Sequence, residues 1–239
     1  KDPLLSIYVD DSKTLGDLVL DGTITLEKLT RIIDNSRKTP AVFAKGGGSL
    51  LTKHTINLQE ITSSLIKHHR PYTKRQPIER ISSRSYTGIV LDARGLLPVH
   101  GEFSESKVFP CLFPKVYKEN MDLVYERNMV YSPIAKKEGI VHYDSTDRNQ
   151  SYRQRVGKDP LWISAKKVFG INRSDVLISR DDYLRITSVP ENLDLLKKAK
   201  VVILLDKSSL EHSVSAPLKN KNYYIAYWQI KKFIHEKSF

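Results

Sequence analysis

Asp92 and Arg94 are the two residues of this sequence whose types and spacing most suggest chemistry. They follow the β-branched and aromatic run YTGIVL, residues 86–91, which predicts a strand. Side chains two positions apart on a strand point to the same face, so the carboxylate and the guanidinium can form a charge-assisted pair. Because burying an unpaired charge is costly, this pair is either a structural lock or a functional edge that faces solvent or a partner.

Two histidines could make Asp92 part of a catalytic site, and they define a hydrolase hypothesis. Such an enzyme would need His100 or His142 beside the Asp92 carboxylate. The sequence contains no nucleophile elbow, zinc-protease helix, paired cysteines or kinase motif set. The lone Cys111, flanked by apolar residues, is typical of a small core residue. We therefore expect no catalytic residues, no metal site and no cofactor.

The net charge of +12 over 239 residues raises a second hypothesis, in which the protein binds an anionic polymer such as nucleic acid or cell-wall polymer. Lysine and arginine are spread along the chain, and their one dense cluster lies between residues 67 and 84. Since a dedicated nucleic-acid binder concentrates basic groups with exposed aromatics, we expect a solvated linker and no nucleic acid. The candidate contacts to a partner or an anion are Lys67, Arg70, Lys74, Arg75, Arg80 and Arg84.

The first part of the chain predicts a small N-terminal α/β portion, residues 1–70. Thr25 is a good helix N-cap, and the apolar residues after it recur at helical spacing. A helix over 25–36, strands over 41–44 and 50–58, and a helix over 59–69 are expected. Residues 71–85 then form a basic connector with two prolines and few apolar residues.

The second part, residues 86–206, predicts a larger C-terminal α+β domain. Apolar patterns predict an irregular or edge strand over 108–117 paired with 123–125, a strand over 161–170 and a strand over 201–205 that is covered on both faces. Residues 144–157 are polar and predict a mobile loop. The fold class is therefore α+β, with an antiparallel or mixed sheet packed against a few helices.

The last part, residues 207–239, predicts a linker and a C-terminal amphipathic helix. Aromatic and aliphatic side chains recur there at helical spacing, which favours docking on the chain's own domain over a partner or membrane surface. These candidate interface residues are Tyr223, Tyr227, Trp228, Ile230 and Phe233. No apolar run is long enough to span a bilayer, and the start at Lys1 suits a processed exported protein or a trimmed segment.

The segment YTGIVLDARG resembles a characteristic element of the FlgP-type bacterial flagellar lipoprotein family, in the form found in spirochaete members. The residues that carry the resemblance are Tyr86, Gly88, Asp92, Arg94 and Gly95, and the similarity extends over about residues 42–206. It implies an exported, periplasmic α+β protein that assembles around the flagellar motor as part of a collar, disk or ring. It also implies protein partners from the motor or collar, a homo-oligomer, no catalytic residues and at most indirect membrane association.

The leading hypothesis is therefore a non-enzymatic structural or assembly protein of the periplasmic flagellar motor. The binder of anionic polymers is the alternative. In either case we expect Asp92 and Arg94 to hold each other or nearby groups where the strand leaves the sheet. Gly95 should then permit the turn that follows, since glycine adopts positive φ without steric cost.

Overall fold

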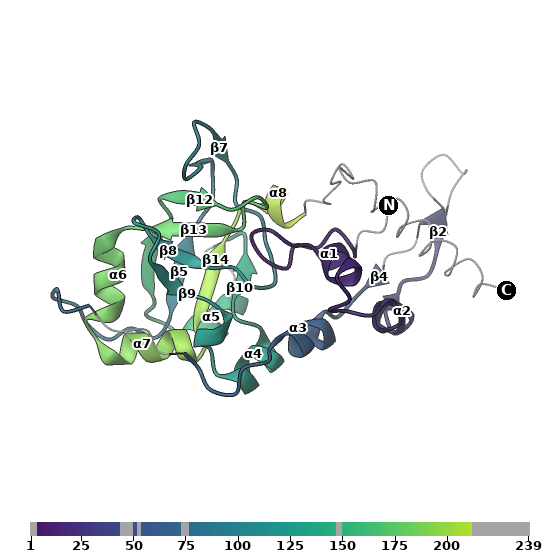
Figure 1. Cartoon of the computed structure of the whole chain (residues 1–239), viewed down its shortest axis with the longest axis horizontal. Coiled ribbons are helices and arrows are strands. Elements are labelled where there is room, and N and C mark those ends of the chain that lie inside the picture. Colours follow the sequence, from purple (N-terminus) through teal and green to yellow (C-terminus); the bar gives the residue numbers. More distant parts are fainter. Residues whose placement is uncertain (1–3, 44–49, 52–53, 73–76, 147–149, 212–239) are drawn as a thin grey trace.

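The computed structural model describes residues 4–43, 50–51, 54–72, 77–146 and 150–211. It confirms an α+β fold with both parallel and antiparallel strand pairs. Figure 1 shows the main sheets in the middle of the molecule, with the N-terminal helices on one side and helices α6 and α7 on the other.

The first four-stranded sheet is entirely parallel and contains the strand predicted around Leu91. Its order is β10-β14-β5-β11, so β5 and β14 are its central strands. Central parallel strands are buried on both faces, which requires near-continuous apolar sequence. The strands are β5 (Ile89–Asp92), β10 (His142–Asp144), β11 (Leu161–Ser164) and β14 (Val201–Leu204), and all four residues of β14 are buried, as predicted.

The second four-stranded sheet is mixed and has the order β12-β13-β8-β9. Strands β8 and β9 form the predicted hairpin, but β8 lies inside the sheet between β13 and β9. Of the two predicted alternatives, the edge strand was wrong because Pro110 and Pro114 precede the strand and so remove no ladder hydrogen bond. The irregular strand is confirmed, since the pairing of β8 with β9 shifts register between Val116 and Tyr117. The strands are β8 (Val116–Lys118), β9 (Leu123–Tyr125), β12 (Lys167–Phe169) and β13 (Asp175–Ile178).

The segment predicted as one strand over 161–170 divides between the two sheets. Strand β11 pairs with β5, and β12 pairs with β13. Within β11 the predicted alternation holds, since Leu161 and Ile163 are buried while Trp162 is 45% exposed. The break at 165–166 carries the chain from one sheet to the other, and the backbone N–H of Lys166 already donates to Leu177.

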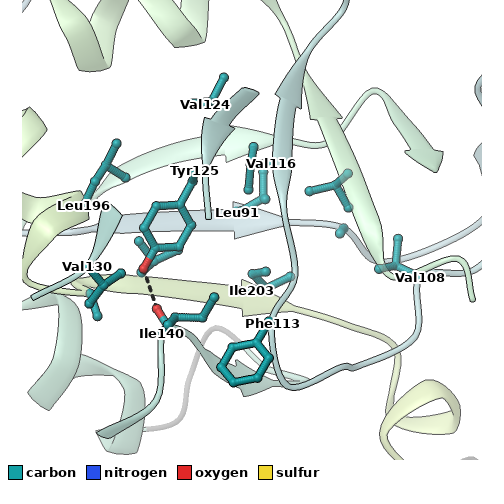
Figure 2. Close-up of a cluster of buried hydrophobic side chains, with 14 of the residues drawn as sticks. Leu91, Val108, Phe113, Val116, Val124, Tyr125, Val130, Ile140, Leu196 and Ile203 are labelled. Atoms are coloured by element: carbon teal, nitrogen blue, oxygen red, sulfur yellow. Dashed lines mark hydrogen bonds between the residues drawn. The ribbon is translucent and has the colours of Figure 1, made fainter. Parts of the chain in front are cut away.

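The main hydrophobic core lies between the two sheets (Figure 2). Leu91 of the first sheet lies among Val116, Val124 and Tyr125 of the second, with only a small gap between them. The Tyr125 hydroxyl is buried and donates to the Ile140 carbonyl at 2.6 Å, which satisfies its polar group inside the core. This layer fixes one face of β5.

Helix α5 (Gln150–Val156) covers the other face of β5, and it corrects the expectation of a mobile loop over 144–157. Tyr152 and Val156 lie one helical turn apart, and both are buried against Val90 and the neighbouring strand β14. The segment is polar overall, yet these two side chains give it an apolar contact with the sheet.

The N-terminal portion consists of short helices and two-stranded pairings. Thr25 caps its helix as predicted, and its hydroxyl accepts the backbone N–H of Lys28. The predicted strand over 50–58 is two short strands in different pairs. The elements are α1 (Leu15–Leu20), α2 (Leu26–Asp34), α3 (Gln59–Leu65), β1 (Arg37–Lys38), β2 (Val42–Phe43), β3 (Leu50–Leu51) and β4 (His54–Thr55).

The remaining elements surround the two sheets. Ser179 caps α6, since its hydroxyl accepts the N–H of Asp182. A small hairpin of β6 and β7 projects from the sheets (Figure 1). The elements are β6 (Leu97–Pro98), β7 (Glu105–Ser106), the 3-10 helix η1 (Arg127–Met129), α4 (Ser132–Glu138), α6 (Arg180–Thr187), α7 (Pro190–Lys197) and α8 (Lys207–Leu210).

Candidate functional site

Asp92 and Arg94 form a bidentate ion pair at the carboxyl end of β5. The Arg94 Nε donates to Asp92 Oδ1 at 2.8 Å, and a terminal guanidinium nitrogen donates to Oδ2 at 2.5 Å. The backbone N–H of Arg94 also donates to Asp92 Oδ1 at 3.2 Å. The Arg94 hydrogen bonds lower the pKa of Asp92 below its ordinary value, against the opposing effect of partial burial. About a third of each side chain is exposed, so solvent screens the pair.

The turn after the ion pair is held by Asp206, which lies just beyond the neighbouring strand β14. Gly95 has φ +86°, the left-handed conformation that the sequence suggested. Its N–H donates to Asp206 Oδ2 at 3.1 Å, and Lys107 Nζ lies 3.6 Å from the same carboxylate oxygen. Asp206 follows β14, so two central strands of the parallel sheet are tied together where they end.

The start of the motif fits against the end of α5. A Cβ atom on Gly88 would lie 2.5 Å from the Val156 Cα, so only glycine allows this approach. The Thr87 hydroxyl donates to the Val156 carbonyl at 2.6 Å and accepts the N–H of Asp159 at 3.0 Å. The N–H of Tyr86 donates to Asn192 Oδ1 at 3.0 Å. Each polar or glycine position of the YTGIVLDARG element thus has a structural contact.

The two histidines of the hydrolase hypothesis have their contacts elsewhere. His142 lies in β10, two strands away from β5, which corresponds to about 10 Å at the usual strand spacing. Burial lowers its pKa, and its Nε2 lies 4.0 Å from Asp144 Oδ2. The His100 ring packs edge-on against Phe169. In the ranges that the structure describes, no cluster of three or more histidine, cysteine, aspartate or glutamate residues is arranged to hold a metal ion.

The described parts of the basic segment contain no helix or strand after α3, and residues 81–84 are attached to the main domain. Arg84 forms a bidentate pair with Asp159, with one nitrogen donating to Oδ1 at 2.8 Å, and its guanidinium lies over the Tyr86 ring. The Ile81 N–H donates to the Ser188 hydroxyl at 2.9 Å. Arg84 is therefore already occupied by a carboxylate. The other candidates that the structure describes, Lys67, Arg70 and Arg80, are exposed, whereas Lys74 and Arg75 lie outside the described residues.

Two exposed apolar side chains lie on neighbouring turns that the sequence did not single out. Phe103 is fully exposed on the β6–β7 hairpin, at 115% of its reference area, and Ile171 is 81% exposed after β12. The turns are joined because Arg173 donates two hydrogen bonds to the Glu102 carboxylate, at 2.8 and 2.9 Å. We call residues 101–104 and 170–173 the turn pair. A single large apolar residue inside each otherwise polar turn was the signal that could have revealed it.

The aromatic residues of the predicted C-terminal helix, Tyr223 to Phe233, lie outside the described residues. Within the described ranges, every helix is too short or too polar to cross a membrane.

Two family models match this chain one after the other. The model described as Treponema pallidum Tp0624, second domain, matches residues 88–207, which is half of the chain. The model described as Treponema pallidum Tp0624, N-terminal domain, matches residues 1–64. The chain belongs to the Tp0624 family. The predicted association with spirochaetes is confirmed at the level of this family, and no curated protein was found that matches the sequence.

The matches to the Tp0624 family follow the order of its domains. The second-domain match begins at Gly88, so it includes the ion pair of Asp92 and Arg94 and the strands of both main sheets. The interval between the two matches, 65–87, contains the basic connector.

Proposed function

We propose that this member of the Tp0624 family is a non-enzymatic assembly protein that acts through protein–protein contacts. The observation that carries the proposal is the turn pair, where Phe103 and Ile171 project into solvent from backbone that is firmly held. Scattered exposed apolar residues are ordinary, but two on adjoining, cross-linked turns form a prominence that is favourable to bury against a partner.

The backbone of the turn pair is fixed on several sides, which reduces the entropy lost when a partner binds. The N–H of His100 donates to the Val168 carbonyl at 2.9 Å, so the hairpin is joined to β12. The side chain of Asn172 donates to the Asp10 carbonyl at 2.9 Å, which anchors the second turn to the N-terminal portion. A rigid apolar projection of this kind suits insertion into a pocket on a neighbouring subunit.

The resemblance to FlgP-type proteins and the spirochaete association of the family suggest the setting. We infer that the protein works in the periplasm as part of the collar, disk or ring around the flagellar motor. Its partners would be other motor or collar proteins, with further copies of this chain as a second class of neighbour. The experiment is a deletion strain imaged at its motors: loss of collar density and impaired motility are expected. An intact collar with normal motility would contradict the proposed role at the flagellar motor.

The contact itself is tested separately with the double substitution Phe103→Ser and Ile171→Ser in the full chain. We expect the melting temperature to stay within about 2 °C of the parent, since exposed side chains contribute little to folding. Co-purification with neighbouring motor proteins should be lost. The matched control is Phe43→Ser, which removes an aromatic ring that is 74% exposed on β2, far from the turn pair (Figure 1). Retained assembly in the double variant would contradict the proposal.

The alternative function is binding of an anionic polymer through the basic segment. The exposure of Lys67, Arg70 and Arg80 favours it. Neutralising Lys74, Arg75 and Arg80 together should then abolish binding to a polyanion and flatten its dependence on salt, because each phosphate contact releases counterions. Binding that is weak and unchanged by these substitutions would leave the assembly function as the better account.

A further inference from the structure

An apolar cavity of about 470 Å³ lies between the N-terminal portion and the edge of the parallel sheet. It is lined by residues that are far apart in the sequence, from the N-terminal loop, α3, strand β10 and α8. Its aliphatic lining includes Ile7, Leu58, Leu112, Ile140, Val141 and Leu210. Figure 1 shows α8, at the yellow end of the described chain, on the side of the sheet that faces α1.

The described residues around this cavity carry no Asp, Glu, Lys, Arg or His side chain. Burial raises the pKa of the Cys111 thiol to about 12 and that of the Tyr143 hydroxyl well above its usual value, so both stay neutral. A charged ligand would therefore lose its hydration without gaining a counter-ion, which is strongly unfavourable.

Two hydroxyl groups of the cavity lining are already paired. The Tyr143 hydroxyl donates to the Cys111 carbonyl at 3.1 Å, and the Thr62 hydroxyl donates to the Leu58 carbonyl at 3.0 Å. Ser209 is only 1% exposed, and its Oγ is buried away from the cavity. The described wall therefore offers few free polar groups to an occupant.

The cavity opens to solvent, and water that enters it meets mainly apolar atoms. At about 30 Å³ each, some fifteen molecules would fill it, and few polar groups of the described wall are free to bind them. An apolar molecule that displaces such water gains the hydrophobic free energy of both surfaces. The volume also falls in the range of natural small-molecule sites, which are concave, mostly apolar and often formed between domains.

We propose that this cavity is a binding site for a neutral, mainly aliphatic molecule that packs against the apolar side chains of its wall. A medium-chain alcohol has this chemistry. This site is separate from the turn pair and does not depend on the proposed assembly function.

The test is a titration of the full chain with the neutral fluorescent probe N-phenyl-1-naphthylamine, followed by displacement with 1-decanol or decanoate at pH 8. Saturable probe binding is expected. Decanol should displace the probe at a concentration at least tenfold lower than decanoate, because the described lining residues include no cation to pair with a carboxylate. Lack of saturable binding, or equal displacement by the two compounds, would overturn the proposal.

Two variants locate the ligand within the molecule. Leu210→Trp fills the cavity and should abolish probe binding, whereas Leu96→Trp adds the same indole at a position that is 60% exposed and should leave binding unchanged. Thermal unfolding of each variant checks that the fold is retained. Probe binding that survives Leu210→Trp would place the probe elsewhere and refute the site.

Discussion

Asp92 lies at the end of the central strand β5. Its contacts decide whether the motif is a structural lock or a functional site. Both carboxylate oxygens accept from Arg94, and the next residue, Gly95, is held by Asp206. The catalytic reading requires a histidine nearby, and both candidates have other contacts. The residue-level geometry therefore favours a structural lock at the point where β5 leaves the sheet.

Replacing Asp92 with Ala should lower the free energy of unfolding by about 1 to 2 kcal/mol at pH 7, a modest value because the pair is a third exposed. The pKa of Asp92 is lowered in the folded state, so its contribution is full above pH 3.8 and disappears as the pH falls through the lower folded value. Urea unfolding at pH 7 and pH 3 measures both effects. Glu119→Ala, in the exposed β8–β9 turn, is the control. Unchanged stability with lost assembly would show that the motif is an interface instead.

Asp175 presents the opposite electrostatic situation. It is fully buried at the start of β13, where Oδ1 accepts the Lys115 N–H at 2.9 Å and Oδ2 has no partner among the described residues. Burial is the main cause that raises its pKa from 3.8 to about 7. The folded protein therefore retains a proton that the unfolded chain releases, so stability should fall as the pH rises from about 4 to about 7.

The substitution Asp175→Asn should remove most of this pH dependence. The amide keeps an acceptor for the Lys115 N–H and carries no charge, so the variant should gain stability relative to the parent as the pH rises. The difference between 3.8 and about 7 corresponds to about 4 kcal/mol, which is an upper bound. Chemical unfolding at pH 4, 5.5 and 8 measures the change. Parallel pH profiles for the parent and the variant would show that Asp175 does not titrate in this range.

At the scale of elements, the close contact between the start of β5 and the end of α5 requires glycine at position 88. Gly88→Ala would place a Cβ 2.4 Å from Val156 Cβ, so α5 must move away from the sheet. We expect a loss of about 2 to 3 kcal/mol and faster amide hydrogen exchange in α5. Gly22→Ala is the control: its φ is +74° with nothing within 4 Å, so it should cost only about 1 kcal/mol. Equal losses in both variants would contradict the packing argument.

The same helix shows where prediction from the sequence ends. The buried strand over 201–205 and the caps Thr25 and Ser179 follow from local pattern, and the structure has them. Helix α5 could not be predicted from local pattern, because it is held by contacts with distant residues. Arg155 donates to the carbonyls of Glu138, Gly139 and Ala199, and no periodicity reveals such partners.

Among the candidate sites, one could be predicted from local sequence and two depend on contacts between distant residues. The ion pair could be predicted from the two-residue spacing of an acid and a base, although the strand ends at Asp92 and the pair forms in the turn that follows. The turn pair depends on an ion pair between Glu102 and Arg173, which are 71 positions apart. The cavity requires Ile7 to lie opposite Leu210, and only the tertiary fold brings them together.

At the scale of the whole molecule, the N-terminal portion is joined to the main domain as one folding unit. Backbone hydrogen bonds run from Leu112 to the Tyr8 carbonyl at 3.0 Å and from Phe113 to the Val9 carbonyl at 2.9 Å. The apolar core is continuous across the junction, with Val9 and Val116 in one buried cluster. Two units that share a core and a set of buried hydrogen bonds are expected to unfold together.

The full chain should therefore show one calorimetric transition, and Asn172→Ala should lower its midpoint by about 3 to 6 °C. Asn172 is buried, and its side chain donates to the Asp10 carbonyl at 2.9 Å, so the variant leaves that acceptor unsatisfied at a cost of about 1 to 2 kcal/mol. Asn35→Ala, at an exposed position after α2, is the control and should shift the midpoint by less than about 1 °C. Because the junction belongs to the common core, the variant should keep a single transition. Two separate transitions in the parent, with only one of them moved by Asn172→Ala, would show instead that the N-terminal portion unfolds as an independent domain.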